Sequence, residues 1–144
     1  MDGKVVNLFI KQSHGQPMHQ VDNLQTISNE GIIGDVSYGR TKRQILIVER
    51  EILKRFNVNP GDLRENLIVS GMRLSDIQSG SILRVGDTLL EITSDCQPCD
   101  MLNNLHPGMR DEIDGDRGIL ARVLEEGTIR VGDPVFLLQP NDRE

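Results

Sequence analysis

Aromatic side chains are scarce in this sequence, and tryptophan is absent. The 144 residues include one tyrosine and three phenylalanines, so the aromatic platforms on which single-stranded nucleic acids stack are nearly missing. The formal net charge of −6 also repels phosphate backbones. We therefore expect no nucleic-acid partner.

Long hydrophobic runs are missing as well. The stretch from Met1 to Ile10 has too short an apolar part for a signal peptide, and no later run approaches the length of a membrane span. We therefore expect a cytoplasmic protein with no membrane partner. Hydrophobic residues make up 37% of the chain and charged residues 26%, which is typical of a globular protein, and residues 1–144 fit a single domain.

Short β-prone runs, by contrast, are frequent. Residues 5–11 alternate in polarity like a half-buried strand, and residues 44–48 are apolar like a strand covered on both faces. Further strands are expected at residues 21–27, 66–70, 81–85, 88–93, 118–124 and 135–138. A helix is expected at residues 49–56, with Glu51 and Arg55 as an i,i+4 ion pair and Asn57 at its end. This pattern predicts a mostly β fold, a barrel or a sandwich.

The tetrapeptide Arg-Val-Gly-Asp occurs twice, at residues 84–87 and 130–133. Each copy stands between two β-prone runs, and a Gly-Asp pair supplies the positive φ of a tight chain reversal. We interpret the repetition as a common turn solution, and we expect a strand, a turn and a strand at each copy.

Cysteine is also rare: the two in the chain form the motif Cys96-Gln-Pro-Cys99. A C-x-x-C redox motif usually opens a helix after a strand of a βαβ unit, but no alternation of strands and helices surrounds this one. A structural zinc site needs four ligands, and the three histidines have no ligand-pair spacing. Neither a thioredoxin-type switch nor a zinc site is favoured.

A single nucleophilic thiol and a pair of packed thiols remain as alternatives. Pro98 suits the first position of a short helix that runs through residues 100–104, which would put Cys99 in the first turn. There, unsatisfied N–H groups and the helix dipole favour a thiolate. Cys99 is then the better nucleophile, whereas Cys96 is a resolving thiol or a small buried residue. Buried cysteine is common, so the packed pair stays open.

The order of several further motifs resembles that of the MOSC domain family, named for the C-terminal domain of molybdenum cofactor sulfurases. The matching pieces follow one another in the family's order over nearly the whole chain: His14-Gly15, Gly31 to Asp35, Arg43-Gln44, Pro60-Gly61-Asp62, Arg64 to Leu67, Val85-Gly86-Asp87, Gln97-Pro98-Cys99, Arg117-Gly118 and Val131 to Val135. Each piece is weak alone, and their joint order carries the resemblance.

The resemblance implies a single-domain MOSC-type β-barrel with a few short helices. It places the family's characteristic cysteine at Cys99, which would carry sulfur as a persulfide or coordinate molybdenum in a bound molybdenum cofactor. Both roles need an accessible thiolate. It also suggests pocket residues that bind a cofactor or fix the backbone around it: Asp35, Arg43, Glu65, Asn66 and Arg117.

The sequence departs from the family pattern at two places. Many relatives have a basic residue and a histidine where this chain has Val36-Ser37, and many have arginine where it has Cys96. The lost positive charge weakens the case for a phosphorylated pterin, unless it is replaced by another cation: Arg40, Lys42, Arg110 or Arg117. A second thiol near Cys99 suits persulfide chemistry instead.

These considerations rank three hypotheses. The first is a sulfur carrier with Cys99 as the sulfur-accepting nucleophile and Cys96 as resolving thiol, which would act in molybdenum cofactor or metal–sulfur assembly. Its partner would be a cysteine desulfurase as sulfur donor or a molybdenum enzyme as acceptor. The pyridoxal phosphate associated with the family would belong to that separate desulfurase chain. The second is a molybdenum-cofactor-binding module or reductase component. The third is a non-catalytic interaction domain.

Overall fold

The computed structural model describes residues 2–138, and strands dominate them. The strands are β1 (Asp2–Ile10), β2 (His19–Val21), β3 (Asn23–Ile27), β4 (Gly31–Ile32), β5 (Ile45–Glu49), β6 (Leu67–Ser70), β7 (Ile82–Val85), β8 (Thr88–Asp95), β9 (Ile119–Glu125), β10 (Gly127–Arg130) and β11 (Pro134–Leu137). The helices are α1 (Arg50–Phe56), α2 (Leu102–Leu105) and α3 (Met109–Glu112), with a 3₁₀ turn, η1, at Leu74–Asp76.

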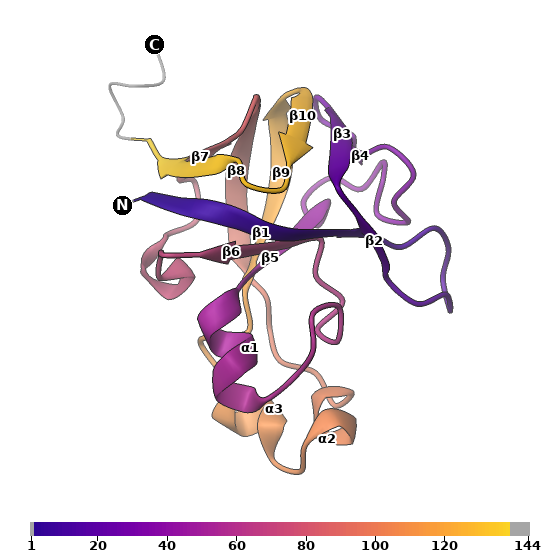
Figure 1. The fold of residues 1–144 in the computed structure, drawn as a ribbon, viewed down its shortest axis with the longest axis vertical. Helices are drawn as coiled ribbons and strands as arrows, with labels where there is room; N and C mark the ends of the chain where they lie inside the picture. Colours follow the sequence, from indigo (N-terminus) through magenta and orange to yellow (C-terminus); the bar gives the residue numbers. More distant parts are fainter. Residues whose placement is uncertain (1, 139–144) are drawn as a thin grey trace.

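Most of the strands close into a barrel (Figure 1). The hydrogen-bonded order is β11-β7-β8-β9-β5-β6-β1, and β1 closes the ring by pairing with β11. The neighbours in this ring are antiparallel except β5 and β6, which run parallel. The predicted mostly β fold is therefore confirmed, as a barrel rather than a sandwich.

A small second sheet, in the order β10-β3-β4, lies against β8 and β9 of the barrel. The first Arg-Val-Gly-Asp copy joins the antiparallel neighbours β7 and β8, as a hairpin does. The second copy joins β10 to β11, which belong to different sheets. Both copies therefore lie between two strands, as expected, but the second one moves the chain from the small sheet back into the barrel.

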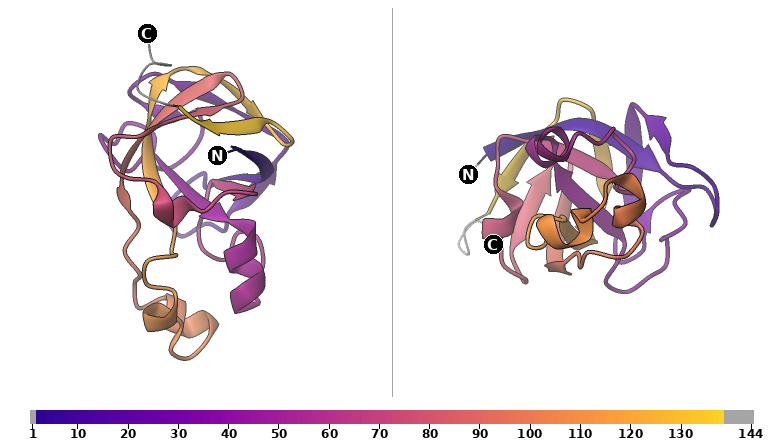
Figure 2. Two further views of the ribbon diagram at one scale, coloured as in Figure 1. Left: turned by 90° about the vertical axis from the view of Figure 1, so that its left-hand side faces the viewer. Right: turned by 90° about the horizontal axis from the view of Figure 1, so that it is seen from below.

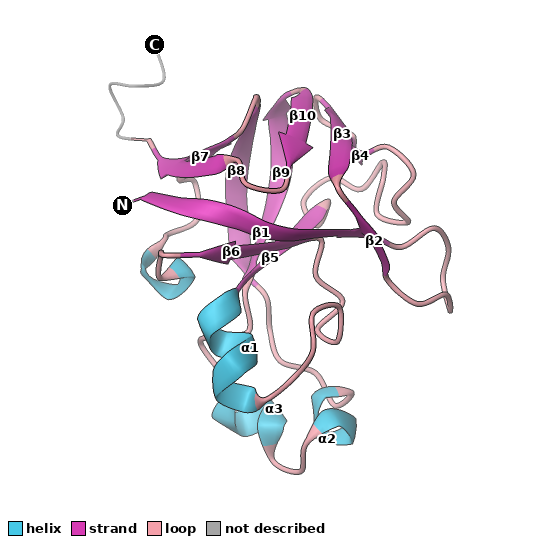
Figure 3. Ribbon diagram, in the orientation of Figure 1, coloured by secondary structure: helices cyan, strands magenta, loops and turns pink. Residues whose placement is uncertain are grey.

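The helices lie at one end of the barrel (Figures 2 and 3). One hydrophobic cluster fills the barrel, and a second lies between the barrel wall and the helices. Strand β5 contributes to both, because Ile45 and Ile47 belong to the barrel cluster while Leu46 and Val48 belong to the helical cluster. This explains the consecutive apolar residues that predicted a strand covered on both faces.

Two local expectations need correction. Residues 21–27 form parts of two strands, β2 and β3, with a break between them. The ion pair expected within α1 is replaced by longer-range contacts: Arg55 pairs with Asp116 at 3.2 Å, and Glu51 accepts a hydrogen bond from the Gly71 N–H at 3.4 Å. Asn57 ends the helix, as predicted, and its backbone adopts the left-handed conformation.

No helix within residues 2–138 has both the length and the apolar character needed to cross a membrane.

Candidate functional site

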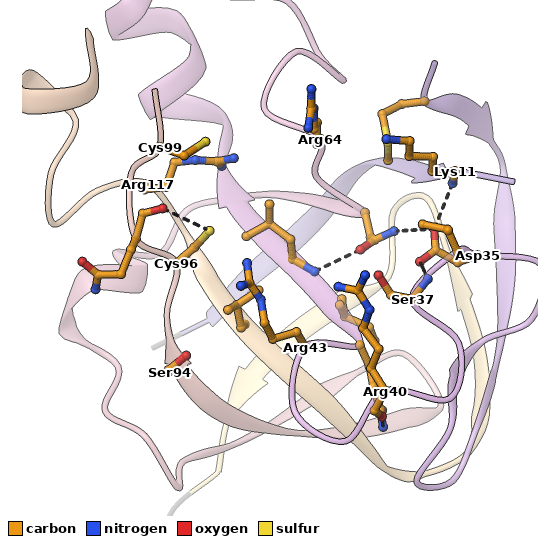
Figure 4. Close-up of a pocket in the computed structure, with 18 of the residues that line it drawn as sticks. Lys11, Asp35, Ser37, Arg40, Arg43, Arg64, Ser94, Cys96, Cys99 and Arg117 are labelled. Atoms are coloured by element: carbon orange, nitrogen blue, oxygen red, sulfur yellow. Dashed lines mark hydrogen bonds between the residues drawn. The ribbon is translucent and has the colours of Figure 1, made fainter. Parts of the chain in front are cut away.

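Both cysteines lie in the wall of a pocket of about 620 Å³ (Figure 4). Five segments build this pocket, namely the loop after β1, the loop before β5 with the first residues of that strand, the turn before β6, the end of β8 with the segment after it, and the start of β9 with the loop before it. The side chains that line it and enter the argument below are Lys11, Asp35, Val36, Ser37, Arg40, Arg43, Arg64, Asn66, Cys96, Cys99 and Arg117.

Asp35 and Asn66 hold these segments together. The Asp35 carboxylate accepts hydrogen bonds from the backbone N–H groups of Lys11 and Ser37, at 2.9 and 3.1 Å, and from the Asn66 side chain at 3.2 Å. Asn66 also donates to the Phe9 carbonyl and accepts from the Leu46 N–H, at 3.2 and 3.0 Å. Both residues are buried, so they fix the backbone around the pocket.

Glu65 lies behind the pocket wall and not in it. It is fully buried, and neither of its carboxylate oxygens has a hydrogen-bond partner within the described part of the chain. Burial raises the pKa of Glu65 above its ordinary value of 4.5. The backbone N–H groups of Glu65 and Gly61 and the charge of Arg117 offset part of this increase in pKa, although none of them has the geometry of a hydrogen bond to the carboxylate. Glu65 is not among the residues that line the pocket, whereas Arg117, whose charge acts on it, is.

The raised pKa of Glu65 makes the stability of the protein depend on pH. Below the ordinary value of 4.5, the carboxyl group is protonated in both the folded and the unfolded chain. As pH rises, the unfolded chain ionises first, so the folded state loses relative stability until the folded pKa is passed. A pKa difference of one between the two states corresponds to about 1.4 kcal/mol.

We therefore expect Glu65→Gln to gain stability relative to the wild type between pH 4 and pH 7, since the amide cannot ionise. Urea unfolding of both proteins at several pH values measures this difference. Glu112→Gln, at an exposed position of α3, serves as the matched control and should follow the wild type. A constant difference between Glu65→Gln and the wild type over this range would contradict the assignment.

The two cysteines differ sharply in exposure. Cys99 is exposed, whereas Cys96 is 7% exposed and belongs to the helical core cluster. The Cys96 Sγ lies 3.9 Å from the Gln97 carbonyl oxygen, and burial raises the pKa of the Cys96 thiol. Arg117 and Arg43 act in the opposite direction and lower it, so both guanidinium groups lie within electrostatic range of the sulfur. Cys99 is the accessible thiol of the pair.

The expected helical position of Cys99 is wrong. Helix α2 begins at Leu102 and contains four residues, so Cys99 precedes it. The Cys99 carbonyl accepts a hydrogen bond from the Leu102 N–H at 3.1 Å, which closes a turn before the helix. Pro98 therefore does not open a helix, and Cys99 does not lie in the first turn of one.

Positive charge predominates in this pocket, in contrast to the net charge of −6 of the chain. Five cationic side chains line it, against two carboxylates, Asp35 and Asp95. Among the four replacement cations considered above, Arg40 and Arg117 line the pocket, Lys42 lines a different cavity, and Arg110 pairs with Asp100 at 2.6 Å. The remaining lining cations are Lys11, Arg43 and Arg64.

Lys11 and Arg64 were not predicted as pocket residues. Arg64 is an exposed residue between the buried Leu63 and Glu65, and its φ of 62° is a left-handed conformation that is uncommon for arginine. The sequence did hold a signal for Arg64. It belongs to the motif from Arg64 to Leu67, and Asn66 of the same motif was predicted as a pocket residue. The replaced positions Val36, Ser37 and Cys96 all line the pocket, which makes these departures relevant to the ligand.

Among residues 2–138, no group of three or more histidine, cysteine, aspartate or glutamate side chains is arranged to hold a metal ion.

Comparisons with known proteins agree with this fold. At 24% identity, the YuaD protein from Bacillus subtilis superposes with a TM-score of 0.80, over 94% of each chain. YiiM from Escherichia coli has a TM-score of 0.72 at 24% identity, over 96% of this chain and 70% of its own. YiiM from Geobacillus stearothermophilus has a TM-score of 0.71 at 21% identity, over 95% of this chain and 75% of its own. Identities this low establish a shared fold only.

A search of curated protein sequences finds no match. The family model of the MOSC domain, however, matches residues 34–136, which is well over half of the chain. This span contains Asp35, Arg43, Glu65, Asn66, both cysteines and Arg117. The chain thus belongs to the MOSC domain family.

Proposed function

We propose that this MOSC protein is a sulfur carrier that accepts sulfur as a persulfide on Cys99. The observation that carries the proposal is an exposed thiol in the wall of a pocket with an excess of positive charge. Family membership links the chain to molybdenum cofactor biology, so delivery to that cofactor or to metal–sulfur assembly is the role that we favour.

The transfer step needs an anionic nucleophile. The Cys99 thiolate attacks the terminal sulfur of a donor persulfide, a new S–S bond forms, and the donor cysteine leaves as a thiolate. The cations that line the pocket attract the anionic persulfide of a donor. Exposure of Cys99 allows the sulfur atom of a partner protein to reach it.

Cys96 can act as a resolving thiol by attacking Sγ of the Cys99 persulfide, which releases hydrosulfide and leaves a disulfide. Its burial and the raised pKa of its thiol oppose this step. We therefore propose that resolution is slow and that the persulfide persists until an acceptor arrives.

Sulfur loading by a separate cysteine desulfurase tests the proposal. The protein is incubated with the desulfurase, its pyridoxal phosphate and cysteine, and its intact mass is then measured. We expect one added sulfur atom per chain in the wild type and in Cys96→Ala, and none in Cys99→Ala. An unloaded wild type, or equal loading of Cys99→Ala, would refute the carrier function.

The charge of the pocket also favours a second candidate, a module that binds molybdenum cofactor. The lining cations suit a phosphate group, the volume of about 620 Å³ admits an organic cofactor, and Cys99 is available as a molybdenum ligand. The bound cofactor would supply the redox chemistry of a reductase component. Pterin fluorescence and molybdenum content of the protein after exposure to the cofactor test this candidate, and protein that takes up neither would argue against it.

A further inference from the structure

Arg117 is a buried cation whose hydrogen-bonding groups are mostly unused. It is 4% exposed, and one terminal nitrogen donates to the Leu63 carbonyl at 2.7 Å. Among residues 2–138, its Nε and other terminal nitrogen have no hydrogen-bond partner, and the buried Glu65 carboxylate interacts with its charge without a hydrogen bond. Leaving N–H groups of a buried charge unpaired is costly, so an anion brought to this wall of the pocket would be stabilised by Arg117.

The backbone fixes Arg117 beside the cysteine motif. Strands β8 and β9 pair as far as Asp95 and Ile119, and the Cys96 N–H extends this ladder by donating to the Gly118 carbonyl at 2.9 Å. Residue 117 is therefore held opposite the start of the motif by main-chain bonds. Figure 4 shows Arg117, Cys96 and Cys99 together on one side of the pocket.

Arg43 supplies a second guanidinium group to the same region. It is exposed and lines the pocket, and its charge reaches the Cys96 sulfur, as that of Arg117 does. An exposed guanidinium group can bind two oxygens of one oxoanion, whereas the buried one adds a fixed positive charge behind it. The two residues thus form a subsite for a small oxoanion near the thiols.

We propose, building on the sulfur-carrier function, that thiosulfate is a direct sulfur donor to Cys99 and that its sulfonate group binds at Arg43 and Arg117. The Cys99 thiolate attacks the outer sulfur of thiosulfate and forms a persulfide. The bond between the two sulfur atoms of thiosulfate breaks, and its electron pair leaves with sulfite. The step is balanced without any oxidant or reductant.

The chemistry of the pocket suits this donor. A thiolate and the thiosulfate dianion repel each other in water, and preorganised cations remove that barrier. Sulfite leaves as a stable anion and needs no proton, in contrast to the alkoxide that departs from a phosphate ester. The buried carboxylate of the pocket, Asp35, already accepts three hydrogen bonds and is poorly placed to donate a proton.

The test is incubation of the full-length protein with thiosulfate in the absence of desulfurase. Intact mass should increase by one sulfur atom, and sulfite should appear in equal amount. The second-order rate constant of sulfite release should fall as sodium chloride is raised, because salt screens the attraction between the pocket and the dianion.

Variants then test the oxoanion subsite. Arg43→Gln removes an exposed charge and should lower this rate constant by about tenfold or more. Arg84→Gln makes the same charge change at an exposed position of β7 outside the pocket, and it should react like the wild type. Arg117→Lys should also react more slowly, and circular dichroism shows whether it is folded. If Arg117→Lys is not folded, the reaction rate of Arg43→Gln alone tests the subsite.

The outcomes separate the two proposals. Loading by desulfurase without loading by thiosulfate would overturn the donor assignment and leave the carrier function intact. Loading by neither would overturn both. Rapid loading of Arg43→Gln at the wild-type rate would overturn the subsite.

Discussion

Gly118→Ala should lower the free energy of unfolding by about 3 kcal/mol or more. Gly118 has a φ of 127°, a conformation that residues with a side chain rarely adopt. A Cβ atom there would lie 2.6 Å from the Ile47 carbonyl oxygen and 2.9 Å from a Val48 methyl group. Strand β5 cannot withdraw from this contact, since both of its faces are buried. Urea unfolding of the variant and the wild type measures the loss.

Gly115→Ala is the matched control. Gly115 also has a positive φ, of 88°, but a methyl group added at this position would have no atom of residues 2–138 within 4 Å beyond its chain neighbours. Only backbone strain remains, which costs about 1 kcal/mol. Equal losses in the two variants would contradict the conclusion that residue 118 lies too close to β5 to carry a side chain.

Asn66→Ala should lower the free energy of unfolding by about 3 kcal/mol, because it removes both the acceptor and the donor group of a side chain in a buried hydrogen-bond network. The Leu46 N–H loses its acceptor, and the Phe9 carbonyl and the Asp35 carboxylate each lose a donor. Thermal or urea unfolding measures the effect. Sulfur loading should slow too, since Asn66 joins β1, β5 and the Asp35 loop around the pocket.

Asn104→Ala provides the comparison for this substitution. Asn104 is exposed in α2, so its removal should change stability by no more than about 0.5 kcal/mol. Comparable losses from Asn66→Ala and Asn104→Ala would show that the network contributes little.

Periodicity predicted most of the fold. Alternation located β1, consecutive apolar residues located β5, and glycine-rich breaks separated β6, β7 and β8. Strand β10 was expected only as the unbounded run before the second Arg-Val-Gly-Asp copy, because Gly127–Arg130 has one buried position and gives no alternating signal of its own. Local patterns also left barrel and sandwich open, because the pairing of β1 with β11 that closes the ring joins residues near the two ends of the chain.

The site was predictable in its chemistry and less so in its geometry. Motif order pointed to Asp35, Asn66, Arg117 and Cys99, all of which lie around one pocket. The helix position of Cys99 was wrong because Asp100 and Met101 form turns instead of continuing a helix from Pro98. The burial of Arg117 and the left-handed backbone of Arg64 arise from tertiary packing, which a sequence pattern does not encode.

The double role of β5 has a consequence for how the molecule responds to a docking partner. Ile45 and Leu46 form part of the pocket floor, yet they anchor the two hydrophobic clusters on opposite faces of one strand. Separating the helical end from the barrel would expose one whole face of that strand, so the two layers should unfold as one cooperative unit. Adjustment to a partner is then confined to the rim segments that carry Arg43, Arg64 and Cys99, above a floor that keeps its shape.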